Sequence, residues 1–511
     1  MKKLISIFLT LALIFSLSIT AFAAEGTYTL RITGAAGHTY DIYQIYTGDI
    51  SQEGEETVLS NVKYGQNHYP VDGETGDAVP ATELENLVNA PNPVDLLDAA
   101  VKGNPFENDV TPAEGETVIE ITNIPAGYYM IVDVSSNLPD GQTKSPIILQ
   151  VLENVTIASK HASIVSEKKV DDKNDSTTDE DAVNWQDSAD YDFGDDVPFQ
   201  LSVTLPTTLN SYDSYALTFH DQQQTGFDTP TIQEVYILKA DGTKIEIPAV
   251  TGTNAGYTLH NACPSSSTCE FDGCTFAVEV GDIKELYGDN AFADGDKLIV
   301  EYTAELTNTA NVGRAGNENG MYVCHPDGHT PEDYVTVLTY ELKVNKIDGA
   351  SQEALKGAGF TLYKWSATTN DWTAVGEEIK GEEITSFTWS GIDGGKYKLV
   401  ETTTPAGYNT IADIEFTIDS NHKEEWTKGG NAAFLDLIAK DTNGKIVFAD
   451  ATGEAAAEDG KLEGNIENYK GTILPETGAQ GTIMLIGFST MLVMVAAIFM
   501  ITRKKMSIYE D

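Results

Sequence analysis

A long apolar run near the C-terminus limits where the rest of this chain can fold. Residues 481–501 carry no charge, and Arg503, Lys504 and Lys505 follow them. A helix of roughly 20 apolar residues crosses the hydrocarbon core of a bilayer, and basic residues directly after it hold that end in the cytoplasm. The sequence therefore predicts one membrane-spanning helix with a short basic tail inside the cell.

The N-terminus has the pattern of a secretory signal peptide at residues 1–23. Two lysines precede an apolar stretch at residues 4–19, and Ala-Phe-Ala at residues 21–23 supplies a small-residue cleavage site. We expect the mature chain to begin near Ala24, with an uncleaved N-terminal anchor as the alternative. The body between the two apolar segments is therefore expected outside the membrane.

Composition favours extracellular β modules and argues against a nucleic-acid partner. The chain has 511 residues, which suggests three or four domains. It carries 31 Lys and Arg against 79 Asp and Glu, a formal net charge of −48, and the phosphates of nucleic acid would be repelled by such a surface. The 23 tyrosines, 18 phenylalanines and 44 glycines fit strands joined by turns.

The pattern along the body predicts an all-β chain of tandem β-sandwich domains. Aromatic and β-branched segments with partial alternation recur throughout, and helical periodicity is scarce outside residues 94–103. We predict domains at residues 24–160, 161–337 and 338–470, followed by a C-terminal signal at residues 471–511.

Three polar side chains lie on apolar strand faces in the third domain. Lys346 alternates with Leu342 and Val344, and Glu401 and Asn468 occupy comparable positions in a middle strand and the last strand. Burial disfavours the charged forms of lysine and glutamate. A neutral Lys346 amine could then attack the Asn468 carboxamide, with Glu401 as the proton-transferring acid. Surface positions for the same residues are the alternative.

The second domain looks like the central domain of major pilins, and this resemblance implies a comparable set with aspartate as the acid. Asp221 closes the segment YALTFHD, where alternate residues are apolar. We favour Lys168 over Lys169 as the amine, because Lys168 shares a face with Val170. We favour Asn319 over Asn317 as the carboxamide.

The first domain lacks an equivalent lysine. Asp133 ends a strand that resembles the one ending at Glu401, but Arg31 stands near where a lysine would be needed. Arginine stays charged and is no nucleophile of this kind. We predict no internal cross-link in this domain.

Four cysteines in an exported chain suggest disulfides, with three connectivities that the sequence leaves open. A zinc site involving His325 or His329 is the less favoured alternative, because the spacing contains no Cys-x-x-Cys pair. Calcium binding by Asp171, Asp179 and Asp181 is also disfavoured, because the acidic run lacks the order of a calcium loop. We expect no metal and no cofactor. The cysteines are Cys263, Cys269, Cys274 and Cys324.

The C-terminal segment resembles the cell-wall sorting signal of Gram-positive surface proteins. It combines a Leu-Pro-x-Thr-Gly pentapeptide with the apolar span and the basic tail. The resemblance implies that a sortase, a cysteine transpeptidase, cuts between Thr and Gly and passes the Thr477 carbonyl to an amine. The pentapeptide consists of Leu474, Pro475, Glu476, Thr477 and Gly478.

The second and third domains resemble those of sortase-assembled major pilins. Residues 397–408 match the Y-x-L-x-E-x-x-x-P-x-G-Y pattern of collagen-adhesin B-type repeats, an immunoglobulin-like fold, with Glu401 as its acid. The resemblance implies Lys346–Asn468 and Lys168–Asn319 isopeptide bonds that join the first strand of each domain to the last.

In pilins, the amine that receives the threonine belongs to a lysine of the next subunit. That lysine follows a V-x-V-Y-P motif, and the segment VTIASK places Lys160 at the corresponding junction. This chain has Ala158 and Ser159 in place of Tyr-Pro. Lys144 and Lys173 are the fallback candidates, and a solvated linker lysine is the alternative reading of Lys160.

The resemblance predicts a structural protein, not an enzyme: the backbone subunit of a covalent, cell-wall-anchored pilus. Its partners would be a pilin-specific and a housekeeping sortase, identical subunits and peptidoglycan. The alternative is a minor pilin or a singly anchored adhesin that binds a host or bacterial surface ligand. A secreted glycosidase with paired carboxylates is a distant third hypothesis.

Overall fold

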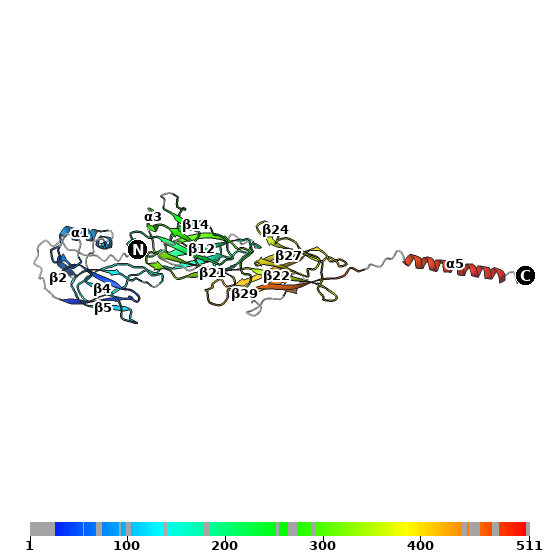
Figure 1. Cartoon of the computed structure of the whole chain (residues 1–511), viewed down its shortest axis with the longest axis horizontal. Helices are drawn as coiled ribbons and strands as arrows, with labels where there is room; N and C mark the ends of the chain where they lie inside the picture. Colours follow the sequence, from blue (N-terminus) through cyan, green and yellow to red (C-terminus); the bar gives the residue numbers. More distant parts are fainter. Residues whose placement is uncertain are drawn as a thin grey trace.

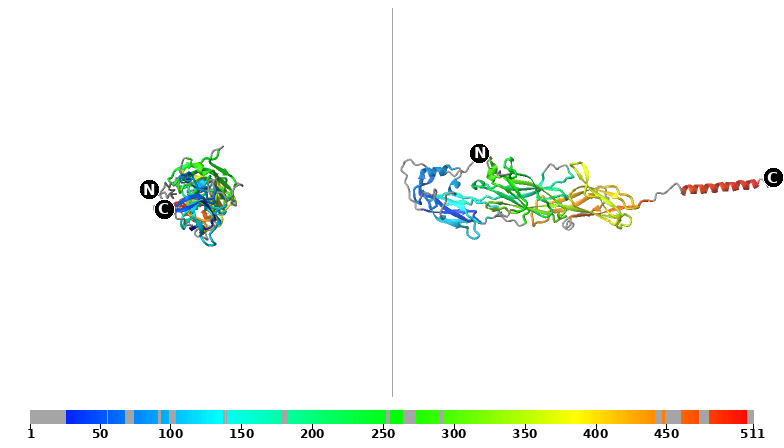
Figure 2. Two further views of the ribbon diagram at one scale, coloured as in Figure 1. Left: turned by 90° about the vertical axis from the view of Figure 1, so that its left-hand side faces the viewer. Right: turned by 45° about the horizontal axis from the view of Figure 1, so that its top comes forward.

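The chain forms a row of three β modules followed by a separate helix (Figure 1). Seen from the end, the modules lie behind one another, which makes the body a narrow rod (Figure 2). The predicted signal peptide and residues 473–479 fall outside the described part. The computed structural model describes residues 26–54, 56–67, 74–90, 93–98, 104–136, 138, 140–177, 183–251, 255–263, 273–288, 292–441, 447–448, 460–472 and 480–506.

The first module, residues 26–158, packs two sheets and a short helical layer. One sheet has the order β5–β1–β8, with β8 parallel to β1, and the other has the order β3–β2–β6–β7, with β4 against β2. The predicted helix at residues 94–103 overlaps α2, whereas α1 escaped prediction because its buried face consists of only Leu84 and Leu87. The elements are β1 (Thr27–Thr33), β2 (Tyr40–Glu53), β3 (Glu56–Tyr64), α1 (Ala81–Asn89), α2 (Pro93–Asp98), β4 (Glu107–Val110), β5 (Val118–Pro125), β6 (Gly127–Asp133), β7 (Ile147–Val151) and β8 (Val155–Ala158).

The second module, residues 166–338, is a sandwich of two larger sheets. Their orders are β10–β9–β12–β18–β14–β15 and β11–β21–β19–β13–β17–β16, with β20 against β19. Alternate apolar residues from both inner faces form one core. The elements are β9 (Ser166–Asp171), β10 (Trp185–Gln186), β11 (Ser188–Asp190), β12 (Asp196–Thr204), η1 (Leu209–Ser211), β13 (Leu217–Gln223), β14 (Thr231–Leu238), β15 (Lys244–Glu246), β16 (Tyr257–His260), β17 (Phe276–Val280), α3 (Ile283–Tyr287), β18 (Lys297–Glu305), β19 (Asn317–His325), β20 (Gly328–His329) and β21 (Asp333–Leu338).

The third module, residues 340–468, is a smaller sandwich with its own core. Its sheets have the orders β26–β22–β31–β30 and β24–β23–β27–β28–β29, with β25 against β23. The strands β22 and β31 pair in parallel, so the first and last strands of this module are neighbours. The elements are β22 (Tyr340–Asp348), β23 (Gly359–Ser366), β24 (Asp371–Ala374), β25 (Ile379–Lys380), β26 (Ser386–Ile392), β27 (Gly395–Thr403), β28 (Ile414–His422), β29 (Phe434–Asp441), β30 (Val447–Phe448) and β31 (Lys461–Asn468).

Buried charges join the second module to the third. Lys364 of β23 is 5% exposed and contacts Asp175 at 2.8 Å, Asp192 at 2.7 Å and Asp393 at 2.5 Å. At Gly391, whose φ is +77°, an added Cβ would lie 1.9 Å from the ring of Phe193, so only glycine admits this aromatic contact between modules. The junction is therefore a packed interface.

The C-terminal helix α5 (Gln480–Met506) stands apart from the β modules (Figure 1). Its segment Leu485–Arg503 is long and apolar enough to cross a membrane, and none of that segment is buried inside the protein. The all-β fold class with a C-terminal candidate membrane span, predicted from the sequence, is confirmed.

Candidate functional site

A lysine, an acid and an asparagine meet in the core of the second module. Lys168 on β9, Asp221 on β13 and Asn319 on β19 are each 0% exposed. The Lys168 amine donates a hydrogen bond to Asp221 Oδ2. Strand alternation turns all three side chains toward the space between the two sheets, where apolar neighbours exclude water.

A fourth residue, Tyr302 on β18, links the other three, and sequence reasoning missed it. Its hydroxyl lies 2.9 Å from Lys168 Nζ, donates to Asp221 Oδ2 at 3.0 Å and accepts from Asn319 Nδ2 at 2.8 Å. In the sequence, Tyr302 alternates with Leu298 and Val300. This pattern is equally typical of a tyrosine that only packs in the core.

Burial favours the neutral forms of the amine and the acid. It raises the pKa of Asp221 and lowers the pKa of Lys168, and in each case the charge on the partner opposes the shift only in part. Asp221 Oδ1 and Asn319 Oδ1 are buried without a hydrogen-bond partner among the described residues. A proton on the Asp221 carboxyl would turn one of these acceptors into a donor.

The geometry separates the favoured residues from their alternatives. Lys169 points away from the cluster and contacts Asp187 at 2.6 Å. The carboxamide of Asn317 is occupied by backbone: it accepts from the Asn311 amide at 2.7 Å and donates to the Asn311 carbonyl at 3.0 Å. The structure therefore brings Lys168 and Asn319, not Lys169 and Asn317, to Asp221.

The expectation that each pair joins the first strand of its module to the last is wrong for the second module. Asn319 lies on β19, and β20 and β21 follow before the module ends. β21 pairs with β19 on one side and with β11 on the other. The chain therefore contributes one more long strand to this sheet after the strand that carries Asn319. Alternation within a strand could not reveal this extra return.

In the third module, Lys346, Glu401 and Asn468 are likewise brought together. Lys346 and Asn468 are 0% exposed and Glu401 is 6% exposed. Asn468 Nδ2 donates to Glu401 Oε1 at 2.8 Å, while Lys346 Nζ donates to the backbone carbonyl of Ile466 at 3.0 Å. Lys346 stands directly opposite Ile466 in the parallel pairing of β22 and β31, two residues from Asn468.

In the third module, as in the second, burial disfavours the charged form of the lysine. Burial lowers the pKa of Lys346 to about 8, against the opposing attraction of Glu401. At neutral pH about one amine in ten would then be uncharged, compared with fewer than one in a thousand for a solvated lysine. Asn468 Oδ1 is buried without a hydrogen-bond partner among the described residues. The other oxygen of Glu401 accepts from the Ile411 amide at 3.0 Å, which fixes the carboxyl group.

The first module places a histidine, and not a lysine, beside its buried acid. Asp133 accepts a hydrogen bond from His38 Nδ1 at 2.6 Å, and both side chains are buried. Arg31 lies on the surface and pairs with Glu120 at 2.8 Å. The prediction that this module has no internal cross-link stays a prediction.

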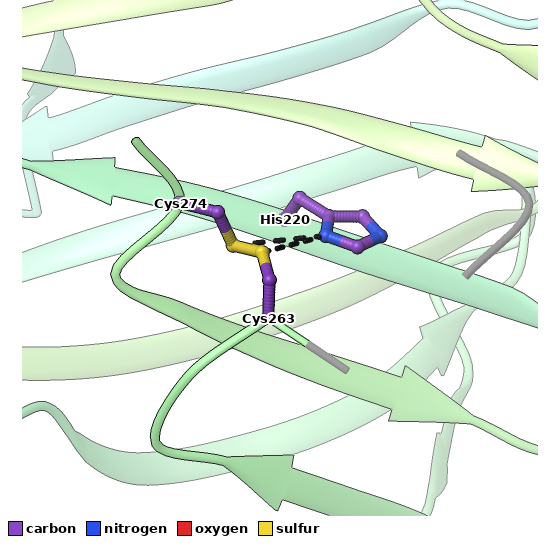
Figure 3. Close-up of side chains that lie close together, drawn as sticks. All are labelled: His220, Cys263 and Cys274. Carbon is purple, nitrogen blue, oxygen red and sulfur yellow. Dashed lines mark hydrogen bonds between the residues drawn. A yellow bond between two sulfur atoms is a disulfide. The ribbon is translucent and has the colours of Figure 1, made fainter. Parts of the chain in front are cut away.

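A disulfide covers the outer face of the strand that carries Asp221. Cys263 and Cys274 are bonded, and His220 Nδ1 lies 3.1 Å from Cys263 Sγ (Figure 3). His220 is 0% exposed and faces away from the Asp221 side of the strand. Its pKa is lowered to about 4, mainly by burial. Cys269 lies outside the described residues, and Cys324 is not free.

Three groups of metal-ligand side chains occur among the described residues, and each is already engaged by the protein. The sulfurs beside His220 are in a disulfide. In the second group, Asp190 accepts from the Gly394 amide at 2.5 Å, and in the third group Lys364 contacts Asp192 at 2.7 Å. Asp171 accepts from the Asn184 amide at 2.7 Å and contacts Lys173 at 3.0 Å, while Asp179 and Asp181 lie outside the described residues. The groups are His220 with Cys263 and Cys274, Asp172 with Asp190 and His422, and Asp192 with Asp195 and Asp393.

Of the candidate acceptor lysines, Lys160 is the exposed one at the junction of the first two modules. It lies two residues after the end of β8, and its amine forms no hydrogen bond or ion pair within the described residues. Lys144 is partly buried and donates to the Ser135 carbonyl at 2.5 Å. Lys173 is paired with Asp171. The pentapeptide Leu474 to Gly478 lies outside the described residues.

Comparisons with known proteins match these observations. A family model described as a prealbumin-like fold domain (SpaA) matches residues 340–432. The trypsin-resistant surface T6 protein of Streptococcus pyogenes serotype M6 is 22% identical over 95% of this chain and 97% of its own length. The structure of the T6 backbone pilin of serotype M6 Streptococcus pyogenes, which has a modular three-domain structure, is 18% identical and covers 87% of this chain and 99% of its own, with a TM-score of 0.51.

A further structure, the full-length major pilin SpaD from Corynebacterium diphtheriae, is 19% identical and covers 88% of this chain and 98% of its own, with a TM-score of 0.45. The family model places its match on the module that contains Lys346 and Glu401. The family-model match and the similarity to the T6 protein and the T6 backbone pilin confirm that the chain resembles the backbone pilins of Gram-positive bacteria, the family that its sequence motifs indicate.

Proposed function

We propose that the chain is the backbone subunit of a covalently polymerised pilus on a Gram-positive cell surface. The proposal divides it into a signal peptide (1–23), three pilin domains (24–160, 161–337 and 338–470) and a sorting signal (471–511). The rod of β modules and the C-terminal apolar helix support this division. The subunit's role is mechanical, because it transmits tension along the fibre.

Each of the last two domains would contain one lysine–asparagine isopeptide bond. The neutral lysine amine attacks the asparagine Cγ, a new C–N bond forms, the Cγ–Nδ2 bond breaks, and ammonia leaves. Asp221 or Glu401 carries the proton from the attacking amine to the departing nitrogen. The burial of the residues in both clusters and the lowered pKa of each lysine support this chemistry.

Subunits would be joined by a sortase between Thr477 and Lys160 of the next subunit. A sortase thiolate attacks the Thr477 carbonyl and displaces the Gly478 amine. The neutral amine of Lys160 then attacks the thioester, and the thiolate leaves. The exposure of Lys160 and the absence of a described partner for its amine support its assignment as the acceptor.

The observation that carries the proposal is the repetition of one buried lysine, acid and asparagine cluster in two successive modules of a rod. Unbonded, such clusters are costly, because buried polar groups without full hydrogen bonding destabilise a fold. A covalent bond between the amine and the carboxamide replaces the uncharged amine and the carboxamide nitrogen with a single amide N–H, so fewer buried donors need partners.

Immunoblotting of the native cell wall tests the polymer. We expect a ladder of high-mass species that resists boiling in detergent, and we expect Lys160→Ala to abolish it while Lys173→Ala leaves it intact. A single species at monomer mass in the wild type would instead favour the alternative function, a minor pilin or singly anchored adhesin.

Intact-mass measurement on the secreted chain tests the internal bonds. Each bond should lower the mass by roughly 17 units, the mass of the ammonia released. Glu401→Ala should restore one such loss, whereas Glu382→Ala, which changes an exposed acid in the same module, should not. An unchanged mass in the Glu401 variant would refute the assigned role of this acid.

A further inference from the structure

Hydrogen bonds clamp the segment that carries Lys160 on both sides of this residue, while the Lys160 side chain is exposed. Before it, the Ser159 amide donates to the Thr33 carbonyl at 2.7 Å, which extends the pairing of β8 with β1 by one residue. After it, the Ala162 amide donates to Thr143 Oγ1 at 3.2 Å, and the Ala162 carbonyl accepts from the Thr143 amide at 3.0 Å. The backbone is therefore fixed on both sides of the lysine, at Ser159 before it and at Ala162 after it.

Side chains strengthen the clamp by pointing inward on both sides of Lys160. Ser159 Oγ lies 2.5 Å from the hydroxyl of Tyr40 and 3.1 Å from His161 Nδ1. Tyr40 is 1% exposed and anchored in the core of the first module. Because Ser159 and His161 face inward, Lys160 between them must face outward, and it is exposed.

The His161 ring is held in turn by a buried pair. It stacks on His38 with ring centroids 4.9 Å apart and an angle of 18° between the planes. His38 contacts Asp133 Oδ2 at 2.6 Å through Nδ1 and Gln142 Oε1 at 2.7 Å through Nε2. Asp133 also accepts from the Ser135 amide at 3.0 Å, so the pair is fixed in the module.

The protonation states fit this arrangement. The hydrogen bond to Asp133 raises the pKa of His38, whereas burial and the neighbouring His38 lower the pKa of His161. A charged His38 donates from both ring nitrogens, and a neutral His161 can accept at Nδ1 from the Ser159 hydroxyl, which accepts from Tyr40. The charged or titratable groups around the two rings are Asp133, Lys144 and Tyr40.

We propose that Tyr40, Ser159 and His161 are positioning residues that present the Lys160 amine to an acyl-enzyme. This inference rests on the proposed function of Lys160 as the acceptor. The hydrogen bonds fix the backbone on both sides of the lysine and so restrict the positions that its side chain can reach. Holding a nucleophile in place contributes strongly to the rate of an acyl transfer. Ser159 supplies a backbone N–H donor, which a proline at that position would lack.

Immunoblotting of the full chain in its native cell tests the role. We expect Ser159→Ala and Tyr40→Phe to lower the fraction of subunit in the ladder severalfold at equal secreted amounts, and Ser159→Thr, which keeps the hydroxyl, to restore it. Thr156→Ala is the matched control, because Thr156 is exposed on the same strand and has no such contact. Wild-type polymerisation in Ser159→Ala and Tyr40→Phe would overturn the inference.

The variant Lys160→Ala distinguishes a failure of the positioning role from a failure of the proposed function. If Lys160→Ala abolishes the ladder while the clamp variants leave it unchanged, the acceptor assignment stands and the positioning role is wrong. If Lys160→Ala leaves the ladder intact, the acceptor assignment is wrong and the clamp has no amine to position.

Hydrogen exchange on the purified full chain tests the clamp without a sortase. The amides of Ser159 and Ala162 should exchange slowly in the wild type, because both are hydrogen bonded. Ser159→Ala should raise the exchange rate at Ala162 by about tenfold or more, whereas Thr156→Ala should not. Rapid exchange of both amides in the wild type would show that the clamp does not hold.

Discussion

In the core of the second module, the hydroxyl of Tyr302 donates a hydrogen bond of 3.0 Å to Asp221. The same oxygen lies 2.9 Å from the Lys168 amine and accepts from Asn319 at 2.8 Å. One phenol therefore contacts the nucleophile, the acid and the carboxamide of the proposed reaction. A side chain in that position can order the three groups and stabilise charge that develops on them.

Replacing Tyr302 with phenylalanine should slow the cross-link of the second module and leave that of the third unchanged. The ring keeps its packing, but the hydroxyl that joins the three groups is lost, and loss of one such donor typically costs on the order of a hundredfold in rate. Mass mapping of proteolytic peptides, followed over time in newly secreted protein, measures the two losses separately.

Tyr236→Phe provides the control for this prediction. Tyr236 is also buried in the second module, but its hydroxyl donates to Glu301 at 2.9 Å, away from the cluster. Equal rates in the wild type and the Tyr302 variant would show that the hydroxyl has no part in the reaction.

The neighbouring lysines of β9 give a second test. Lys168→Met should abolish the mass loss in the second module, because it removes the amine that contacts Asp221 and keeps most of the apolar volume. Lys169→Met should retain the loss, because Lys169 pairs with Asp187 outside the core. A cross-link that closes a loop of this length stabilises by about 5 kcal/mol on the chain-entropy scale for disulfides.

Thermal unfolding completes this test. The Lys168 variant should unfold at a clearly lower temperature than the Lys169 variant. The assignment would be reversed if the Lys168 variant still lost ammonia in the second module and the Lys169 variant did not.

Strand alternation and the family resemblance together predicted the clusters, and alternation contributed because it determines which side chains enter a sandwich core. It placed Lys346 beside Val344 and Asp221 beside Phe219, and the structure buries all four side chains. It could not find Tyr302, since a tyrosine that alternates with apolar residues is normally core. The sequence alone carries no signal that distinguishes the two roles.

The sequence pattern also could not predict contacts between residues that are far apart in the chain. Alternation says nothing of how many strands follow Asn319, so the return of the chain through β21 was not foreseen. The contacts of Ser159 with Tyr40 join residues 119 positions apart, and no local pattern reveals such a pair. The family resemblance identified the position of Lys160 but could not supply the groups that hold it.

Acid should destabilise the second module through His220. Burial lowers the pKa of this histidine from 6.5 to about 4, so between these values the unfolded chain binds a proton that the folded chain does not. Its contribution to stability is therefore intact above pH 6.5 and falls as the pH drops toward 4, by about 3 kcal/mol in all.

The difference in unfolding temperature between the wild type and His220→Gln, measured from pH 7 to pH 4, isolates this effect. We expect the wild type to lose more stability across that interval than the variant. Parallel curves for the two proteins would contradict the prediction.

Alkali should loosen the junction between the second and third modules through His422. Hydrogen bonds and attraction from Asp172 and Asp190 outweigh burial and raise the pKa of His422 to about 10. The folded chain thus keeps a proton that the unfolded chain releases near pH 6.5. The resulting stabilisation is fully present below pH 6.5 and is lost as the pH rises through 10, a change of roughly 3 to 5 kcal/mol.

His422→Gln should remove this dependence, whereas His260→Gln, which alters a more exposed histidine paired with Glu279 at 2.9 Å, should not. Unfolding temperatures between pH 6 and pH 10 measure the stability, and small-angle scattering over the same range measures the length of the rod. His422 also contacts Ser188 of the second module at 2.8 Å, and its deprotonation leaves the carboxylates of Asp172 and Asp190 facing a neutral ring across the junction. A wild-type curve that follows the His422 variant throughout would show that this histidine is not the charge that holds the modules together.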